Sequence, residues 1–292
     1  MEHHEHREDP GAGTDWAAFA DLLELDAEVL HAYLADLTAW VGQLAADSDC
    51  RRIVDLGAGT GTAAIALAQR FAGADVIAVD GSGPLLSRIR AKAVDLGLAG
   101  RVRTIQADLD AGWPALDAGW PALDAIDLAW ASMSLHHLAD PDRTLGDVFA
   151  AIRPGGLLAV AELDAPLRFL PDDLGLGRPG LESRCHAALA VSHARELPHL
   201  GSDWGPRLEQ AGFALIAQRT FAIDLAATHS PSAGRYAQAS LRRARPSLEG
   251  RLAADDLATL DALLDGDGPG SLRHRADLAI RGSRTAWVAR RP

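Results

Sequence analysis

Three closely spaced glycines follow an apolar run in the first third of the chain and could form a ligand-binding turn. The run is Ile53–Leu56, and Gly57, Gly59 and Gly61 come directly after it. Glycine permits the sharp turn and the close backbone approach that a nucleotide needs, and the helix expected next presents unpaired N–H groups. Alone, this pattern is common to many nucleotide-binding proteins.

Asp55 limits the class of ligand that this turn can bind. This carboxylate lies two residues before Gly57, where it would repel the pyrophosphate of a dinucleotide but attract a ligand with ammonium and sulfonium groups. The spacing also disfavours a nicotinamide dinucleotide, because the third glycine of a GxGxxG pattern would fall on Thr62. We therefore expect S-adenosylmethionine, with S-adenosylhomocysteine as the product.

Two further acids follow the next predicted strands. Asp80 ends a strand and could accept hydrogen bonds from both ribose hydroxyls of a nucleoside, a role that NAD and methyl-donor sites share. Asp108 follows another strand and could accept a hydrogen bond from an adenine amino group. Asp108 could instead cap the next segment.

In this order the motifs resemble those of class I S-adenosylmethionine-dependent methyltransferases. VDLGAGTG resembles the first motif of that family, AVDGSGPLL its ribose-binding motif and QADLD its adenine-binding motif. DLAWASMSLHHLADPDRTL resembles the fourth-strand motif, and RPGGLLAVAEL the loop and fifth strand. The resemblance covers about residues 51–163.

The resemblance implies a role for each matching residue. Asp55 would face the methionine amino group, Asp80 would hold the ribose and Leu85 would pack on the adenine. The backbone at the end of the fourth strand would line the cofactor. The implied cofactor-binding residues are Asp55, Gly57, Ala58, Gly59, Gly61, Asp80, Gly81, Ser82, Leu85, Asp108, Leu109, Ala131, Ser132 and Met133.

His136 and His137 are the candidate catalytic residues. Methyl transfer is an in-line displacement at an activated carbon, so the protein mainly aligns the acceptor and excludes water, and a base helps only when the acceptor is protonated. The two histidines follow the fourth strand, and imidazole titrates near neutral pH. They could instead merely shape the turn into the next helix.

Other side chains could face the acceptor, although each is equally explained as solvated or packed. They are Trp16, Tyr33, Glu162, Asp164, Arg168, Arg184, His186, His193 and Tyr236.

Short apolar runs that alternate with helical patterns predict a doubly wound, mostly parallel seven-stranded α/β sheet flanked by helices. The expected strands cover 52–56, 75–80, 102–106, 126–131, 157–163, 213–225 and 284–289. The expected helices cover 62–70, 83–96, 141–152, 181–197 and 204–211, with helical segments over 16–44 and 230–264.

This pattern predicts a disordered arm over 1–15, an N-terminal helical cap over 16–48 and a methyltransferase domain over 49–292. That domain comprises a core over 51–163, an insertion over about 165–200, and C-terminal strands and helices over 201–292. We expect the cap and the insertion to form a lid over the acceptor. The repeat AGWPALD, at 111–117 and 118–124, is expected in a surface loop with one copy bulging outward.

Composition limits the partners. The net charge of -12 argues against nucleic acid. No apolar run approaches the roughly 18 residues that would span a bilayer, so no membrane partner is expected. Cys50 and Cys185 lack metal-type spacing and suit a reducing cytoplasm. We expect a cytoplasmic, metal-independent enzyme, which could be a homodimer.

The sequence therefore favours methyl transfer to an O, N or C atom of a small-molecule acceptor. Two alternatives stay open at this stage. One is a protein of the same fold that binds the cofactor for a non-methylating reaction or a regulatory role. The other is a nicotinamide-dependent oxidoreductase.

Overall fold

A single seven-stranded sheet organises the chain. The computed structural model describes residues 15–46, 49–114, 126–266, 268 and 270–292. The strands are β1 (Arg52–Leu56), β2 (Asp75–Asp80), β3 (Val102–Gln106), β4 (Ile126–Ser132), β5 (Ile152–Leu163), β6 (Ala214–Ala226) and β7 (Ala279–Arg290). Their order is β3-β2-β1-β4-β5-β7-β6, with β7 antiparallel to both of its neighbours. The predicted doubly wound, mostly parallel α/β fold is confirmed.

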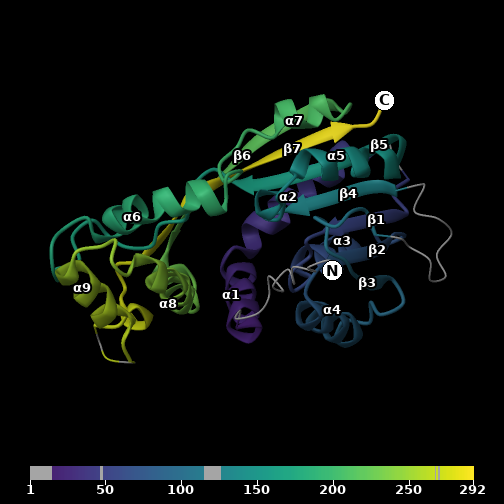
Figure 1. Cartoon of the computed structure of the whole chain (residues 1–292). Coiled ribbons are helices and arrows are strands. Elements are labelled where there is room, and N and C mark those ends of the chain that lie inside the picture. Colours follow the sequence, from purple (N-terminus) through teal and green to yellow (C-terminus); the bar gives the residue numbers. More distant parts are fainter. Residues whose placement is uncertain (1–14, 47–48, 115–125, 267, 269) are drawn as a thin grey trace, which may run out of the picture.

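Helices cover both faces of this sheet (Figure 1). On one face, α2 (His31–Leu44), α3 (Thr62–Arg70) and α4 (Gly83–Asp95) pack on the sheet. On the other face, α5 (Pro141–Ala151) and α7 (Gly205–Gln210) do so. The central strands are therefore buried on both sides, which explains why β1, β2 and β4 read as continuous apolar runs.

A second hydrophobic core lies beyond one end of the sheet. It is formed largely by α6 (Leu181–Glu196), α8 (Ala233–Ala244) and α9 (Ala254–Leu264), with the segments around them. Figure 1 shows these helices as a separate group that the long strands β6 and β7 join to the sheet. We call this group, together with α1 (Trp16–Val29), the cap. It includes α8 and α9, which were expected in the C-terminal part of the methyltransferase domain, over 201–292.

Three side chains from distant segments join the cap to the sheet. Arg284 of β7 is 5% exposed, and its Nη2 lies 2.6 Å from Asp26 Oδ1 of α1. The Tyr236 hydroxyl of α8 donates to the same oxygen at 2.6 Å. A buried guanidinium without a carboxylate would be costly, so this contact fixes α1 against both β7 and α8.

Some sequence predictions fall outside the described residues. The predicted N-terminal arm lies outside them apart from Asp15. The Asp15 side chain caps α1 by accepting hydrogen bonds from the Ala17 and Ala18 amides. The second AGWPALD copy, Trp120 included, also lies outside the described residues, whereas Trp113 of the first copy is half-buried against the sheet.

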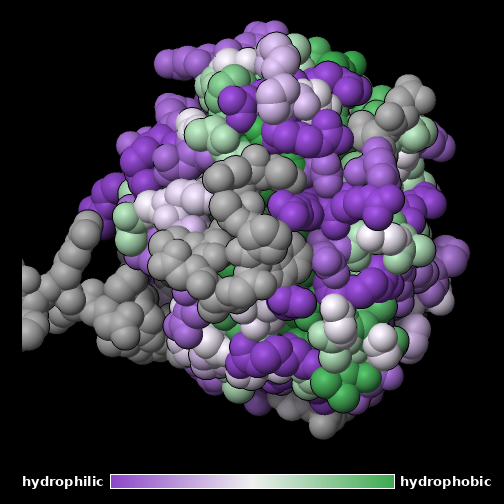
Figure 2. Space-filling model, turned by 90° about the vertical axis from the view of Figure 1, so that its right-hand side faces the viewer, coloured by the Kyte–Doolittle hydropathy of each residue, from purple (hydrophilic) through white to green (hydrophobic). Residues whose placement is uncertain are grey.

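No described helix is long and apolar enough to cross a membrane. The face at which the parallel strands begin is mainly hydrophilic in its described part (Figure 2).

The importance of the Asp26–Arg284 contact can be measured by unfolding in urea. We expect Asp26→Asn to lower the free energy of unfolding by about 2 kcal/mol, because it leaves the buried guanidinium without a counter-charge. The matched control is Asp21→Asn on the same helix, whose partner Arg88 is well exposed. That change should cost less than about 0.5 kcal/mol. Equal effects of the two substitutions would contradict the structural role of Asp26.

Candidate functional site

A cavity of about 480 Å³ lies between the carboxyl ends of the parallel strands and the cap. Its walls come from the segments that follow β1, β2, β3 and β4, and from α1, α2, α8 and β7. Open α/β sheets bind ligands at this edge, and the volume is in the range of small-molecule sites.

Most of the sequence-predicted cofactor residues line this cavity. Gly61, Ser82 and Ala131 are the exceptions: Gly61 and Ser82 precede α3 and α4 as their N-caps, and the Ala131 side chain is buried in the core. These three residues therefore shape the backbone around the cavity and do not form its wall. The residues that do line it are Asp55, Gly57, Ala58, Gly59, Asp80, Gly81, Leu85, Asp108, Leu109, Ser132 and Met133.

The glycine-rich turn is held to the second strand by Asp80. The Gly59 amide donates to Asp80 Oδ2 and the Ser82 amide to Asp80 Oδ1, each at 2.8 Å. Burial raises the pKa of Asp80, and these two amides oppose the rise. Gly57 has φ +67°, and a Cβ there would lie 2.4 Å from Ser134 Cβ. The turn therefore requires glycine at this position.

Asp55 is a buried acid without a full set of partners. It is 2% exposed, and its Oδ2 has no hydrogen-bond partner among the described residues. Burial raises the pKa of Asp55 to about 7; the charge of Asp80 adds to the rise, and the Ala64 amide opposes it. A cationic ligand group in the cavity would supply the missing partner, so the site fits the ammonium group of S-adenosylmethionine.

The end of β4 carries local backbone strain. Met133 has φ +58° and is the only non-glycine residue with positive φ in the described part of the chain. Ser132 and Met133 both line the cavity, and the Met133 amide donates to the Ala161 carbonyl of β5. Such strain is often found at ligand-binding positions.

The two candidate histidines have different surroundings. His136 is 5% exposed, and its Nδ1 lies 2.5 Å from Glu162 Oε2. Glu162 Oε1 also accepts from the Ser134 and Leu135 amides, so this pair holds the turn after β4. Of the two, only His137 lines the cavity; its ring lies 4.0 Å from the ring of His136, centroid to centroid, and is tilted by 40° to it. Burial lowers the pKa of His137 to about 4, with contributions from His136 and Arg243, so this imidazole is neutral at pH 7.

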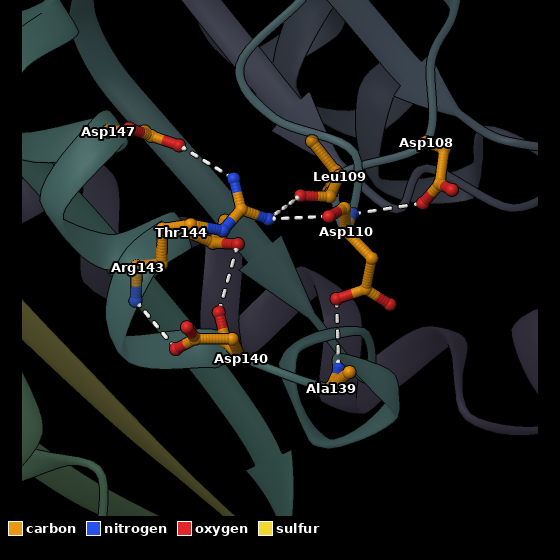
Figure 3. A network of polar contacts seen from close by, with 8 residues as sticks. All are labelled: Asp108, Leu109, Asp110, Ala139, Asp140, Arg143, Thr144 and Asp147. Atoms are coloured by element: carbon orange, nitrogen blue, oxygen red, sulfur yellow. Dashed lines mark hydrogen bonds and ion pairs between the residues drawn. The ribbon is translucent and has the colours of Figure 1, made fainter.

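The loop after β3 is fastened to α5 by Arg143 (Figure 3). Arg143 Nη2 donates to the carbonyls of Leu109 and Asp110 at 2.7 and 2.9 Å, and Nη1 lies 3.3 Å from Asp147. Asp108 Oδ1 accepts from the Asp110 amide at 2.9 Å, so this acid also folds its own loop. Arg143 therefore positions the predicted adenine edge of the cavity.

The further candidates from the sequence fall into two groups. Trp16 and Tyr33 line the cavity, and Glu162 and Tyr236 support it as described above. Arg184 pairs with Asp256 and Arg168 binds Ser183, both away from the cavity wall. Asp164, which binds Ser283, and His186 and His193, which lie on α6, do not line it either.

Sequence reasoning missed several residues of the wall and its support. They are Phe19, Asp26, Arg143, Arg243 and Arg284. Arginine is frequent in this chain, and of these residues only Arg143 belongs to a recognised motif, the fourth-strand segment, which implies no role for it.

The described residues contain no group of three or more His, Cys, Asp or Glu that could hold a metal ion. The strand order, the glycine-rich turn after β1, Asp55 within β1 and Asp80 at the end of β2 together define a class I, Rossmann-like methyltransferase fold.

Comparison with known proteins agrees with this class. The family described as "Methyltransferase domain" matches residues 53–156. The chain is 36% identical over 123 residues to a demethylmenaquinone methyltransferase of Thermus thermophilus, covering 42% of this chain and 52% of that protein. It is 30% identical over 208 residues to a demethylmenaquinone methyltransferase of Clavibacter sepedonicus, covering 64% of this chain and 76% of that protein.

A solved structure shares the fold. It is a proposed methyltransferase from Bacillus halodurans, with a TM-score of 0.53 and 18% sequence identity over 87% of this chain and 98% of that one. The matched segment spans about half the length of the Thermus relative. The chain belongs to the class I S-adenosylmethionine-dependent methyltransferase family.

The positioning role of Arg143 can be tested by hydrogen exchange. We expect Arg143→Met to speed amide exchange over residues 108–112 by about tenfold, because the loop loses two charge-assisted hydrogen bonds. Asp147→Asn is the control, since it removes the ion pair but keeps both carbonyl contacts, and it should change exchange far less. The exchange rates are measured by mass spectrometry of peptides. An unchanged rate in this loop after Arg143→Met would contradict the positioning role of Arg143.

Proposed function

We propose that this protein transfers a methyl group from S-adenosylmethionine to a small-molecule acceptor. The observation that carries the proposal is the buried Asp55 carboxylate, whose Oδ2 has no partner among the described residues, on the wall of the cavity under the glycine-rich turn. Burying such a carboxylate is unfavourable unless a cation meets it.

The remaining wall fits the other parts of the cofactor. Asp80 is held by two amides on the side of the turn, and its position at the end of β2 suits the ribose hydroxyls. Leu85 and Leu109 are apolar wall residues that suit the two sides of an adenine, and Asp108 suits its amino group. Asp55 disfavours a nicotinamide dinucleotide, because the pyrophosphate of that ligand would face this buried carboxylate.

When bound, the cofactor supplies a methyl carbon activated by its sulfonium for in-line displacement. The reacting atoms would lie between the end of β4 and the cap, where apolar wall residues reduce contact with water. Met133 and Ser132 would bound the space beside the methyl group. Neutral His137 can accept a proton at its imidazole nitrogen if the acceptor loses one, and Glu162 holds the turn through His136 and two amides.

Calorimetric titration tests the proposal through Asp55. At about pH 7.5 we expect Asp55→Asn to weaken S-adenosylmethionine binding at least about tenfold, because the isosteric amide carries no negative charge to pair with the ammonium group. The control is Asp95→Asn, an exposed acid at the end of α4, which should bind as the unaltered protein does. Equal binding by the Asp55→Asn protein would contradict the proposal.

The same titration has an expected pH dependence. The pKa of Asp55 is raised to about 7 in the free protein, and the bound ammonium group favours the ionised carboxylate. Affinity should therefore fall as the pH is lowered from about 7.5 to about 6, approaching a tenfold loss per pH unit below the pKa. This dependence should disappear in Asp55→Asn. NAD should show no comparable affinity at any pH.

A further inference from the structure

The cap side of the cavity differs in charge from the strand-end side. The strand ends contribute the acids Asp55, Asp80, Asp108 and Asp110. The cap side carries two arginines, Arg243 from α8 and Arg284 from β7, with Asp26 as its acid. The acidic half suits a cationic cofactor, so the cap half is the part of the cavity left for the acceptor.

The two arginines are not equivalent. Arg284 is neutralised by Asp26, with Nη2 at 2.6 Å from Oδ1. Arg243 lies over the Phe19 ring, with its guanidinium carbon 4.4 Å from the centroid, and contacts no carboxylate among the described residues. It is close enough to His137 to help lower the pKa of that imidazole. The cap half therefore carries one uncompensated positive charge next to the candidate base.

Hydrogen-bond donors are also in excess there. Arg284 Nε is buried and has no partner among the described residues. The buried Tyr33 hydroxyl likewise has no hydrogen-bond partner among the described residues. Burial raises the pKa of Tyr33 to about 12, and the nearby charge of Arg284 opposes this rise. A ligand that pairs with these atoms must supply hydrogen-bond acceptors. Among such groups, a carboxylate fits best, because its two oxygens can bind two N–H groups of one guanidinium.

The rest of the cap wall is apolar. It is lined by Trp16, Phe19, Leu30 and Leu34. These residues would bury the body of a ligand, whereas the arginines would contact one end of it.

We infer that the methyl acceptor is a small organic acid with an apolar body, whose carboxylate is bound by Arg243 on the cap side of the cavity. The inference rests on the proposed function, because it assigns the acidic half of the cavity to the cofactor. Arg243 is here a specificity-determining residue, and the surplus positive charge also disfavours an amine acceptor.

Binding of matched probes tests the inference without knowledge of the natural acceptor. The protein is first saturated with S-adenosylhomocysteine, so that the cofactor half is filled. It is then titrated calorimetrically with sets of a carboxylate, its primary amide and the corresponding primary amine, built on phenyl, cyclohexyl and naphthyl bodies. For at least one body, the carboxylate should bind at least about tenfold more tightly than the amide, and the amine should bind most weakly.

Two substitutions on the same helix separate direct contact from overall charge. Arg243→Gln should reduce the preference for the carboxylate to within about twofold. Arg235→Gln changes the net charge equally at an exposed position of α8 outside the cavity wall, and it should retain the preference. Both arginines are exposed, so neither change removes core packing.

The outcomes are distinguishable. If S-adenosylhomocysteine does not bind, the proposed function and the inference both fail. If it binds but no body shows a preference for the acid, or Arg243→Gln keeps the preference, the inference alone is overturned.

Discussion

The burial of Asp55 beneath the glycine-rich turn is the constraint on which the site depends. Its charge is unfavourable in the free protein because the side chain is desolvated and Asp80 lies nearby, and the raised pKa expresses this cost. The fold supports the arrangement with a strand that is buried from Ile53 to Leu56 and with two amides that hold Asp80 in place. The ionised state of Asp55 becomes favourable once a cation binds beside it. The electrostatic cost in the free site therefore contributes to its affinity for a cationic methyl donor.

The cap completes the cavity through a different set of interactions. Its helices have a hydrophobic core of their own, and α1 links that core to the sheet through Asp26, Arg284 and Tyr236. The strand ends thus present the acids, and the cap side of the cavity presents the aromatic side chains, Arg243 from α8 and Arg284 from β7. Because the two halves come from separate parts of the chain, the acceptor side can vary while the cofactor side stays the same.

The sequence predicted the sheet well because its signals are local. Buried parallel strands read as short apolar runs, and the expected bounds of β1, β2, β3 and α3 agree with the structure. The positions of Asp55, Asp80 and Asp108 at strand ends follow from the same pattern. The roles assigned to these acids stay predictions, although the structure does bring them to one cavity.

Other features depend on contacts between distant residues. Nothing in the sequence distinguishes His136, which pairs with Glu162, from its neighbour His137, which lines the cavity. The packing of α8 and α9 into the cap, and with it the position of Arg243, follows from long-range contacts that no local pattern shows. Gly61 is the N-cap of α3 and does not line the cavity. Its φ of +79° and the close approach of Ile89 exclude a side chain at this position, so glycine is required there for the backbone.

A crystal structure of the complex with S-adenosylhomocysteine tests the central claim most directly. We expect the ligand's amino nitrogen within hydrogen-bond distance of Asp55, its ribose at Asp80 and its adenine between Leu85 and Leu109, with the sulfur facing the cap. A ligand bound in the reverse orientation, or outside this cavity, would contradict the claim.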